Sequence, residues 1–140
     1  IIPTLAKAMA ATWSQDLRQI VLVPIPSSPA NTKIRGFSHT EVFARAIARA
    51  VKGVSVRTLL LPAKGRADQV GLSVDARRKN LEGAFKASVA TKPEGPVIIF
   101  DDVVTSGATL LAGAQTLQQA GVVVAGFCVF ARVLGPEGQF

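Results

Sequence analysis

The chain is poor in the residues that build metal sites, disulfides and aromatic stacking surfaces. Its 140 residues include one Cys, one His, one Trp and no Tyr. Cys128 and His39 alone can form neither a Cys/His zinc site nor a disulfide within the chain, which favours a reducing, cytoplasmic location. With so few aromatic residues, sequence-tolerant stacking on single-stranded nucleic acid has little support. The longest unbroken apolar stretch, residues 121–131, is about half of the roughly 20 residues that a bilayer requires, so we expect no membrane span.

The remaining composition is typical of a globular protein. Hydrophobic residues make up 49% of the chain and charged residues 18%, and a chain of this length can bury a core without a disulfide or a structural metal. We therefore predict one domain over residues 1–140. The chain begins with Ile1 and not with Met, which is compatible with an N-terminal extension missing from this domain.

Charge is distributed unevenly along the chain. Residues 1–92 hold all of the Lys and Arg except Arg132 and have a net charge of +10, whereas residues 93–140 have a net charge of −3. A basic surface attracts phosphate, either on nucleic acid or on a small polyphosphate. A solvated surface with no ligand explains the same charges, so composition alone does not decide between these two alternatives.

Four apolar runs rich in β-branched residues predict four strands, at residues 20–25, 54–61, 97–100 and 122–130. Their apolarity is nearly continuous, which is typical of strands buried on both faces. The segments between them supply helices, so we predict an α/β fold with a mainly parallel sheet flanked by helices.

A helix is predicted to begin after Ser38, because Ser38 and Glu41 have the spacing of a capping box. Apolar residues then recur at helical spacing until Gly53, which offers a left-handed stop. A second helix is predicted between the third and fourth strands, ending before Gly121, and another over residues 4–17. Residues 26–37 and 62–83 are expected to be irregular, and loops of such length in a compact domain are commonly functional or disordered.

The strongest local pattern joins the third predicted strand to the helix that follows it. Asp101 and Asp102 come at the carboxyl end of the strand, where open α/β sheets bind ligands. The next residues are small or carry hydroxyls and lead into a helix N-terminus, whose unpaired amides and positive dipole favour a phosphate. Because neighbouring residues of a strand face opposite ways, the two carboxylates can serve one ligand only if the strand has ended before them. The predicted phosphate cradle consists of Thr105, Ser106, Gly107, Ala108 and Thr109.

Other sites explain this pattern less well. The magnesium-binding strand of a P-loop nucleotidase needs a partner motif in which Lys precedes Ser or Thr, and no Lys in this chain does. A serine hydrolase needs a G-x-S-x-G elbow, which is absent, and it would have to recruit His39 from a helix start. An unliganded strand end followed by a capped helix remains the plain structural alternative.

The stretch from residue 97 to 109 resembles the phosphoribosyl pyrophosphate (PRPP) signature of type I phosphoribosyltransferases. Two further stretches resemble the competence protein F subgroup of that family: residues 23–26 followed by Arg35-Gly36-Phe37, and residues 69–73 followed by Arg77, Asn80 and residues 83–85. The resemblance covers about residues 20–132. Many members of the subgroup begin with a cysteine-rich zinc ribbon, which this chain lacks, so no role of that module is transferred.

The resemblance implies a role for each part of the pattern. Asp101 and Asp102 would bind the ribose hydroxyls of PRPP, and Mg²⁺ through water, while the cradle would bind the 5-phosphate. The loop after the first strand would bind pyrophosphate through Ser27, Lys33 and Arg35. Arg77 would act during catalysis from a mobile loop over residues 62–83. Cys128 and His39 are expected to be structural.

The function implied is transfer of ribosyl 5-phosphate from PRPP to an unidentified nitrogen acceptor, with release of pyrophosphate. One rival is a non-catalytic PRPP sensor or an accessory protein of DNA uptake, since a phosphate cradle indicates binding better than turnover. Another is DNA binding through the basic part of the chain, for which the sequence holds no recognisable motif. Weak, non-specific contact with nucleic acid is compatible with all three. The sequence leaves the oligomeric state open.

Overall fold

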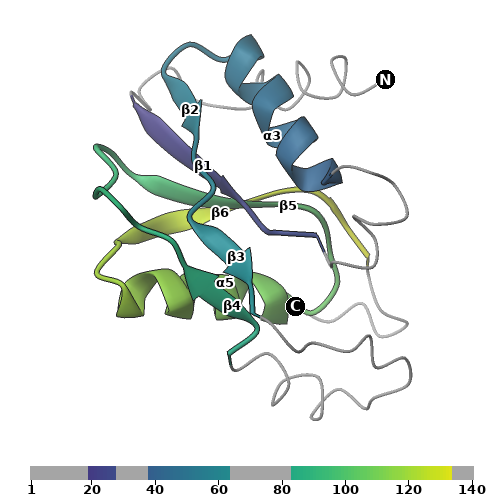
Figure 1. Ribbon diagram of the computed structural model, residues 1–140. Helices are drawn as coiled ribbons and strands as arrows, with labels where there is room; N and C mark the ends of the chain where they lie inside the picture. The colour runs from purple at the N-terminus through teal and green to yellow at the C-terminus, as the bar shows by residue number, and fades with distance from the viewer. Residues whose placement is uncertain (1–18, 28–37, 64–82, 134–140) are drawn as a thin grey trace.

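The computed structural model describes residues 19–27, 38–63 and 83–133. Four strands form a parallel sheet in the order β2-β1-β5-β6, and a separate antiparallel pair joins β3 to β4 (Figure 1). The predicted α/β fold with a mainly parallel sheet and flanking helices is confirmed. The elements in chain order are β1 (Ile20–Pro24), α3 (His39–Ala50), β2 (Val54–Val56), β3 (Leu60–Pro62), β4 (Phe85–Ala87), β5 (Val97–Val104), α5 (Ala108–Gln119) and β6 (Val124–Arg132).

Among the described residues, one helix covers each face of the sheet, with α3 above it and α5 below it in Figure 1. On the α3 face, the centroid of the Phe43 ring lies 5.7 Å from the ring centroid of Phe100 and 5.4 Å from that of Phe130. On the α5 face, alternate residues of β1 and β5 pack with Leu110 and Leu117. Because every residue of β1 is buried, this strand reads as one continuous apolar run, as predicted for a strand covered on both faces.

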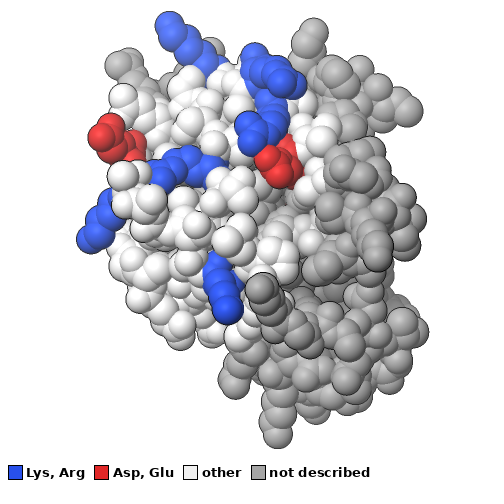
Figure 2. Space-filling view, in the orientation of Figure 1, with Lys and Arg blue, Asp and Glu red and all other residues white. Residues whose placement is uncertain are grey.

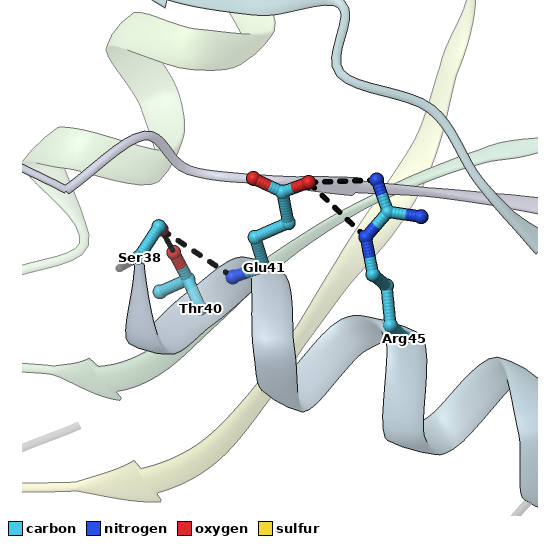
Figure 3. A network of polar contacts seen from close by, with 4 residues as sticks. All are labelled: Ser38, Thr40, Glu41 and Arg45. Atoms are coloured by element: carbon cyan, nitrogen blue, oxygen red, sulfur yellow. Dashed lines mark hydrogen bonds and ion pairs between the residues drawn. The ribbon is translucent and has the colours of Figure 1, made fainter. Parts of the chain in front are cut away.

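Helix α3 begins where the capping pattern predicts. The Ser38 Oγ accepts a hydrogen bond from the Glu41 amide at 3.5 Å (Figure 3). The reciprocal half of the capping box is absent, because the Glu41 carboxylate instead accepts from the Arg45 Nη2 at 2.7 Å and Nε at 3.1 Å. Helix α5 ends as predicted before Gly121, whose φ of 76° allows the Gly121 and Val122 amides to bond back to Gln118 and Leu117, both at 2.9 Å.

The predicted strand over residues 54–61 is wrong as a single element. Val54–Val56 pairs with β1, whereas Leu60–Pro62 leaves that sheet and pairs with Phe85–Ala87, a strand that the sequence did not predict. The run divides because its two halves enter different cores: Val54 and Val56 pack on the α3 side, while Leu59 and Leu60 pack on the α5 side. A continuous apolar pattern cannot reveal such a division.

Two other strand predictions need correction. The strand predicted at residues 97–100 continues to Val104. The last strand is Val124–Arg132, and it alternates between partly buried and exposed residues because it lies at the end of the sheet order. The predicted helix over residues 4–17 lies outside the described residues, as does most of the two predicted irregular segments. Within the described residues, no helix is long and apolar enough to span a membrane.

The aromatic packing beneath α3 predicts a large stability difference between two Phe residues of the same sheet. Phe100 is 0% exposed and immediately precedes Asp101, whereas Phe127 is 46% exposed. Phe100→Ala should lower the free energy of unfolding by about 3–5 kcal/mol, the usual cost of emptying a Phe site in a core. The matched control, Phe127→Ala, should cost less than about 1 kcal/mol. Urea unfolding measures both, and equal losses would contradict the packing described here.

Candidate functional site

The candidate site lies where β1 ends and β5 continues. The ladder between them closes at the pair of Pro24 with Phe100, followed by one hydrogen bond of 2.8 Å from the Ile25 amide to the Phe100 carbonyl. Beyond this point β5 stays paired with β6 through Val104. From Asp101 onward, the side of β5 that faced β1 therefore no longer pairs with β1, and we call this the freed edge of β5. It lies at the carboxyl end of the parallel sheet, where ligands of open α/β sheets bind.

Asp101 and Asp102 lie inside β5, so the expectation that the strand ends before them is wrong. Strand alternation therefore places their side chains on opposite faces of the sheet. Each carboxylate also accepts a hydrogen bond from the next backbone amide: Asp101 Oδ1 from Asp102 at 3.0 Å, and Asp102 Oδ1 from Val103 at 2.8 Å. Both side chains are partly buried. The two carboxylates therefore lie on opposite faces, and one ligand can reach both only across the edge of β5 that no longer pairs with β1.

Asp101 is electrostatically unusual. Burial raises its pKa from 3.8 to about 7, and the charge of Asp102 acts in the same direction, while the hydrogen bond from the Asp102 amide opposes the rise. Near neutral pH the carboxyl is therefore only partly ionised. Donor groups of a ligand, or a cation, would favour its ionised form.

Helix α5 begins beside this pair with an open N-terminus. Its N-cap is Gly107, which has a φ of 75° and offers no side-chain cap, and the first turn contains no acidic residue. Of its first amides, that of Ala108 has only a long contact of 3.4 Å to the Ser106 Oγ. Amides at a helix start lack partners within the helix and carry the positive end of its dipole. This terminus can therefore bind an anion, and Thr105 and Ser106 are exposed next to it.

The N-terminus of α3 differs because hydroxyl groups already occupy it. Thr40 donates a hydrogen bond of 2.6 Å from its Oγ1 to the Ile25 carbonyl and is 4% exposed. The Ser38 Oγ lies 2.9 Å from the Thr40 Oγ1 and 3.0 Å from the Ser27 Oγ. This hydroxyl chain, Ser27, Ser38 and Thr40, ties the end of β1 to the start of α3. Sequence reasoning missed Thr40, although a Thr two residues after a helix cap was visible.

The structure brings together part of the predicted site. Ser27, Asp101, Asp102 and the predicted cradle all lie toward the carboxyl end of the parallel sheet, while Lys33, Arg35 and Arg77 lie outside the described residues. In the described ranges no group of three or more His, Cys, Asp or Glu residues could hold a metal ion. Cys128 packs beside the α3 core, and burial raises the pKa of its thiol. His39 is the first residue of α3.

Comparison with known proteins shows a shared fold. No protein-family model and no curated protein matches the chain. Among solved structures, the allosteric regulatory enzyme of purine biosynthesis is similar at 17% identity, with a TM-score of 0.60 over 92% of this chain, which spans only 25% of that enzyme. A hypoxanthine phosphoribosyltransferase from Staphylococcus aureus is similar at 15% identity in two crystal forms, with TM-scores of 0.58 and 0.55 over 99% of this chain and 67% or 70% of that one. The chain therefore has the fold seen in phosphoribosyltransferases.

The raised pKa of Asp101 predicts a pH-dependent stability. The unfolded chain loses this proton near 3.8, whereas the folded protein keeps it until about 7. Stability should therefore fall as the pH rises through this window and stay lower above it. Asp101→Asn removes the ionisation, so its melting temperature relative to the wild type should rise between about pH 4 and about pH 8. Thermal unfolding in EDTA measures this difference.

Glu94→Gln, a change of an exposed acid, is the matched control for that experiment. Its difference from the wild type should vary much less with pH. A difference between Asp101→Asn and the wild type that is constant across the window would show that burial does not hold the proton on Asp101.

Proposed function

We propose that this chain binds PRPP at the carboxyl end of β5 and transfers its ribosyl 5-phosphate group to a nitrogen nucleophile. The observation that carries the proposal is the N-terminus of α5, which has no side-chain cap at Gly107 and begins shortly after the strand that holds Asp101 and Asp102. An acid pair that can bind hydroxyl groups, followed by an anion site, matches the sugar and the phosphate of one ligand. The fold shared with a hypoxanthine phosphoribosyltransferase supports the same assignment.

The 5-phosphate is assigned to the cradle of Thr105, Ser106, Gly107, Ala108 and Thr109. Gly107 is the N-cap and has no side chain to cap the amides that follow, and the Ala108 amide has only the contact of 3.4 Å to the Ser106 Oγ. Backbone amides and the helix dipole together favour an anion at this position. Hydroxyl groups of Thr105 and Ser106 can add hydrogen bonds to the phosphate oxygens.

The ribose is assigned to the freed edge of β5. Asp101 and Asp102 border this edge from opposite faces of the sheet, and a carboxylate accepts hydrogen bonds from sugar hydroxyls. Such donors stabilise ionised Asp101, which compensates for the charge that burial disfavours. Binding of the sugar and ionisation of Asp101 are therefore coupled.

Magnesium fits this site as a companion of the substrate. The two carboxylates provide oxygen ligands, but the described residues supply no third acid, so Asp101 and Asp102 would hold Mg²⁺ through water. When bound, the ion neutralises charge on the departing pyrophosphate.

In the proposed reaction, the bond from the ribose anomeric carbon to the pyrophosphate oxygen breaks as the acceptor nitrogen forms a bond to that carbon. The nitrogen then loses its proton to solvent. No protein nucleophile is needed, because the protein mainly holds the phosphate and orients the ribose. We further assign Ser27, Lys33 and Arg35 to pyrophosphate and Arg77 to closure over the substrate. These roles, the acceptor and membership of the competence protein F subgroup are proposals from the sequence alone.

Contact with nucleic acid is expected to be weak. Figure 2 shows Lys and Arg at several separate places on the face in view, with acidic side chains beside some of them. Arg45 is already paired with Glu41 at 2.7 Å, and the Arg57 Nη2 donates to the Thr91 carbonyl at 2.9 Å. Such contacts to a phosphate backbone would be non-specific and strongly salt-dependent.

The proposal predicts that PRPP with Mg²⁺ stabilises the fold through the acid pair. At about a hundredfold excess over Kd, binding should add about 2.7 kcal/mol to the free energy of unfolding, which a thermal shift assay detects. Asp101→Asn combined with Asp102→Asn should lose this shift, and the exposed change Glu94→Gln should keep it. A wild type that PRPP leaves unshifted, or a double variant that is shifted equally, would contradict the proposed site.

Turnover distinguishes a transferase from a PRPP sensor. Pyrophosphate release that depends on a nitrogen base or amine would show a transferase, and Arg77→Ala should then lower release far more than PRPP affinity. Stabilisation by PRPP without release, across all tested acceptors, would instead favour the sensor or DNA-uptake accessory protein.

A further inference from the structure

The hydroxyl chain beside the site has a fixed direction. The Thr40 Oγ1 lies 2.6 Å from the Ile25 carbonyl oxygen. A carbonyl cannot donate, so the single hydroxyl hydrogen of Thr40 must point to it. The contact of 2.9 Å between Ser38 and Thr40 therefore needs the hydrogen of Ser38, because that of Thr40 is already used.

The same count settles the next link. Ser38 gives its hydrogen to Thr40, so the contact of 3.0 Å between Ser27 and Ser38 must use the hydrogen of Ser27. The two lone pairs of the Ser38 Oγ then accept from the Ser27 hydroxyl and from the Glu41 amide at 3.5 Å. Figure 3 shows the part of this chain at Ser38, Thr40 and Glu41. Ser27 is left with lone pairs only.

The direction of these hydrogen bonds matters because Ser27 lies toward the candidate site. Ser27 follows β1 after its ladder with β5 has closed, so it lies toward the same carboxyl end of the sheet as Asp101. A hydroxyl whose hydrogen is already used in a hydrogen bond can only accept. It therefore repels phosphate oxygens, which are also acceptors, and attracts a hydrogen-bond donor. Such a group is a ligand hydroxyl or a water molecule bound to a metal ion.

We infer that Thr40 is a positioning residue that, through Ser38, makes Ser27 a hydrogen-bond acceptor at the PRPP site. This inference rests on the proposed function and revises one part of it, because Ser27 then gives no hydrogen bond to pyrophosphate. Thr40 itself is buried and touches no substrate. It acts by directing the hydrogens of the two serine hydroxyl groups.

The test is the affinity for inorganic pyrophosphate without metal, measured by isothermal titration calorimetry. In Thr40→Val, Ser38 loses its acceptor and turns its hydrogen to Ser27, which frees the Ser27 hydrogen for an anion. Thr40→Val should therefore bind pyrophosphate about three- to tenfold more tightly than the wild type, the equivalent of one added hydrogen bond. The conservative variant Thr40→Ser keeps the direction and should match the wild type.

Two further variants complete the cycle. Ser27→Ala combined with Thr40→Val should abolish the gain in pyrophosphate affinity that Thr40→Val shows alone. Ser38→Ala frees the same hydrogen by another route and serves if Thr40→Val does not fold. A structural defect alone would weaken binding, so a gain in affinity that Thr40→Ser does not show is specific to the direction of the chain.

Two results would overturn the inference. One is a gain in pyrophosphate affinity that persists when Ser27→Ala is combined with Thr40→Val, which would show that the gain does not come from the Ser27 hydrogen. The other is that neither Thr40→Val nor Ser38→Ala binds more tightly than Thr40→Ser. If either result occurs while PRPP with Mg²⁺ still stabilises the wild type, the direction of the chain is wrong and the proposed function stands. Failure of PRPP to stabilise the wild type contradicts the proposed function itself.

Discussion

The difference in length between two neighbouring strands determines the rest of the candidate site. β1 ends at Pro24, opposite Phe100, whereas β5 continues beside β6 to Val104. The part of β5 beyond Phe100 holds Asp101 and Asp102 outside the β1 ladder, and a short loop then leads from it to the start of α5. The fully buried Phe100 anchors this arrangement from below α3. If β5 ended level with β1, it would leave no freed edge for a ligand.

The short stretch from Asp101 to the start of α5 changes sharply in charge and in the hydrogen-bonding groups that it offers. Partly buried Asp101 keeps its proton to about pH 7, whereas the start of α5 presents amides and a positive dipole without a cap. One end of the stretch favours hydroxyl donors or a cation, and the other favours an anion. The start of α3 is capped by Ser38 and tied to β1 by Thr40, so of the two described helices only α5 has an open N-terminus.

The sequence predicted the parallel sheet, the two described helices and the close succession of the acid pair and the start of α5, because these features depend on local patterns. The cap at Ser38 and the stop at Gly121 are both set by hydrogen bonds within a few residues. The split of residues 54–61 was missed because it depends on which core receives Leu60. The extension of β5 was missed because acidic residues are uncommon in strands, and pairing with β6 stabilises them there. Thr40 was missed because its partner, the Ile25 carbonyl, is distant in sequence.

The central claim is that the open N-terminus of α5 holds the phosphate of a ribosyl phosphate. Titration of the ¹⁵N-labelled protein with ribose 5-phosphate, followed by amide chemical shifts, tests it directly. The account predicts saturable shifts of the amides of Gly107, Ala108 and Thr109, with small changes at the capped first turn of α3. Saturable shifts centred on α3, with the α5 amides unmoved, would contradict it.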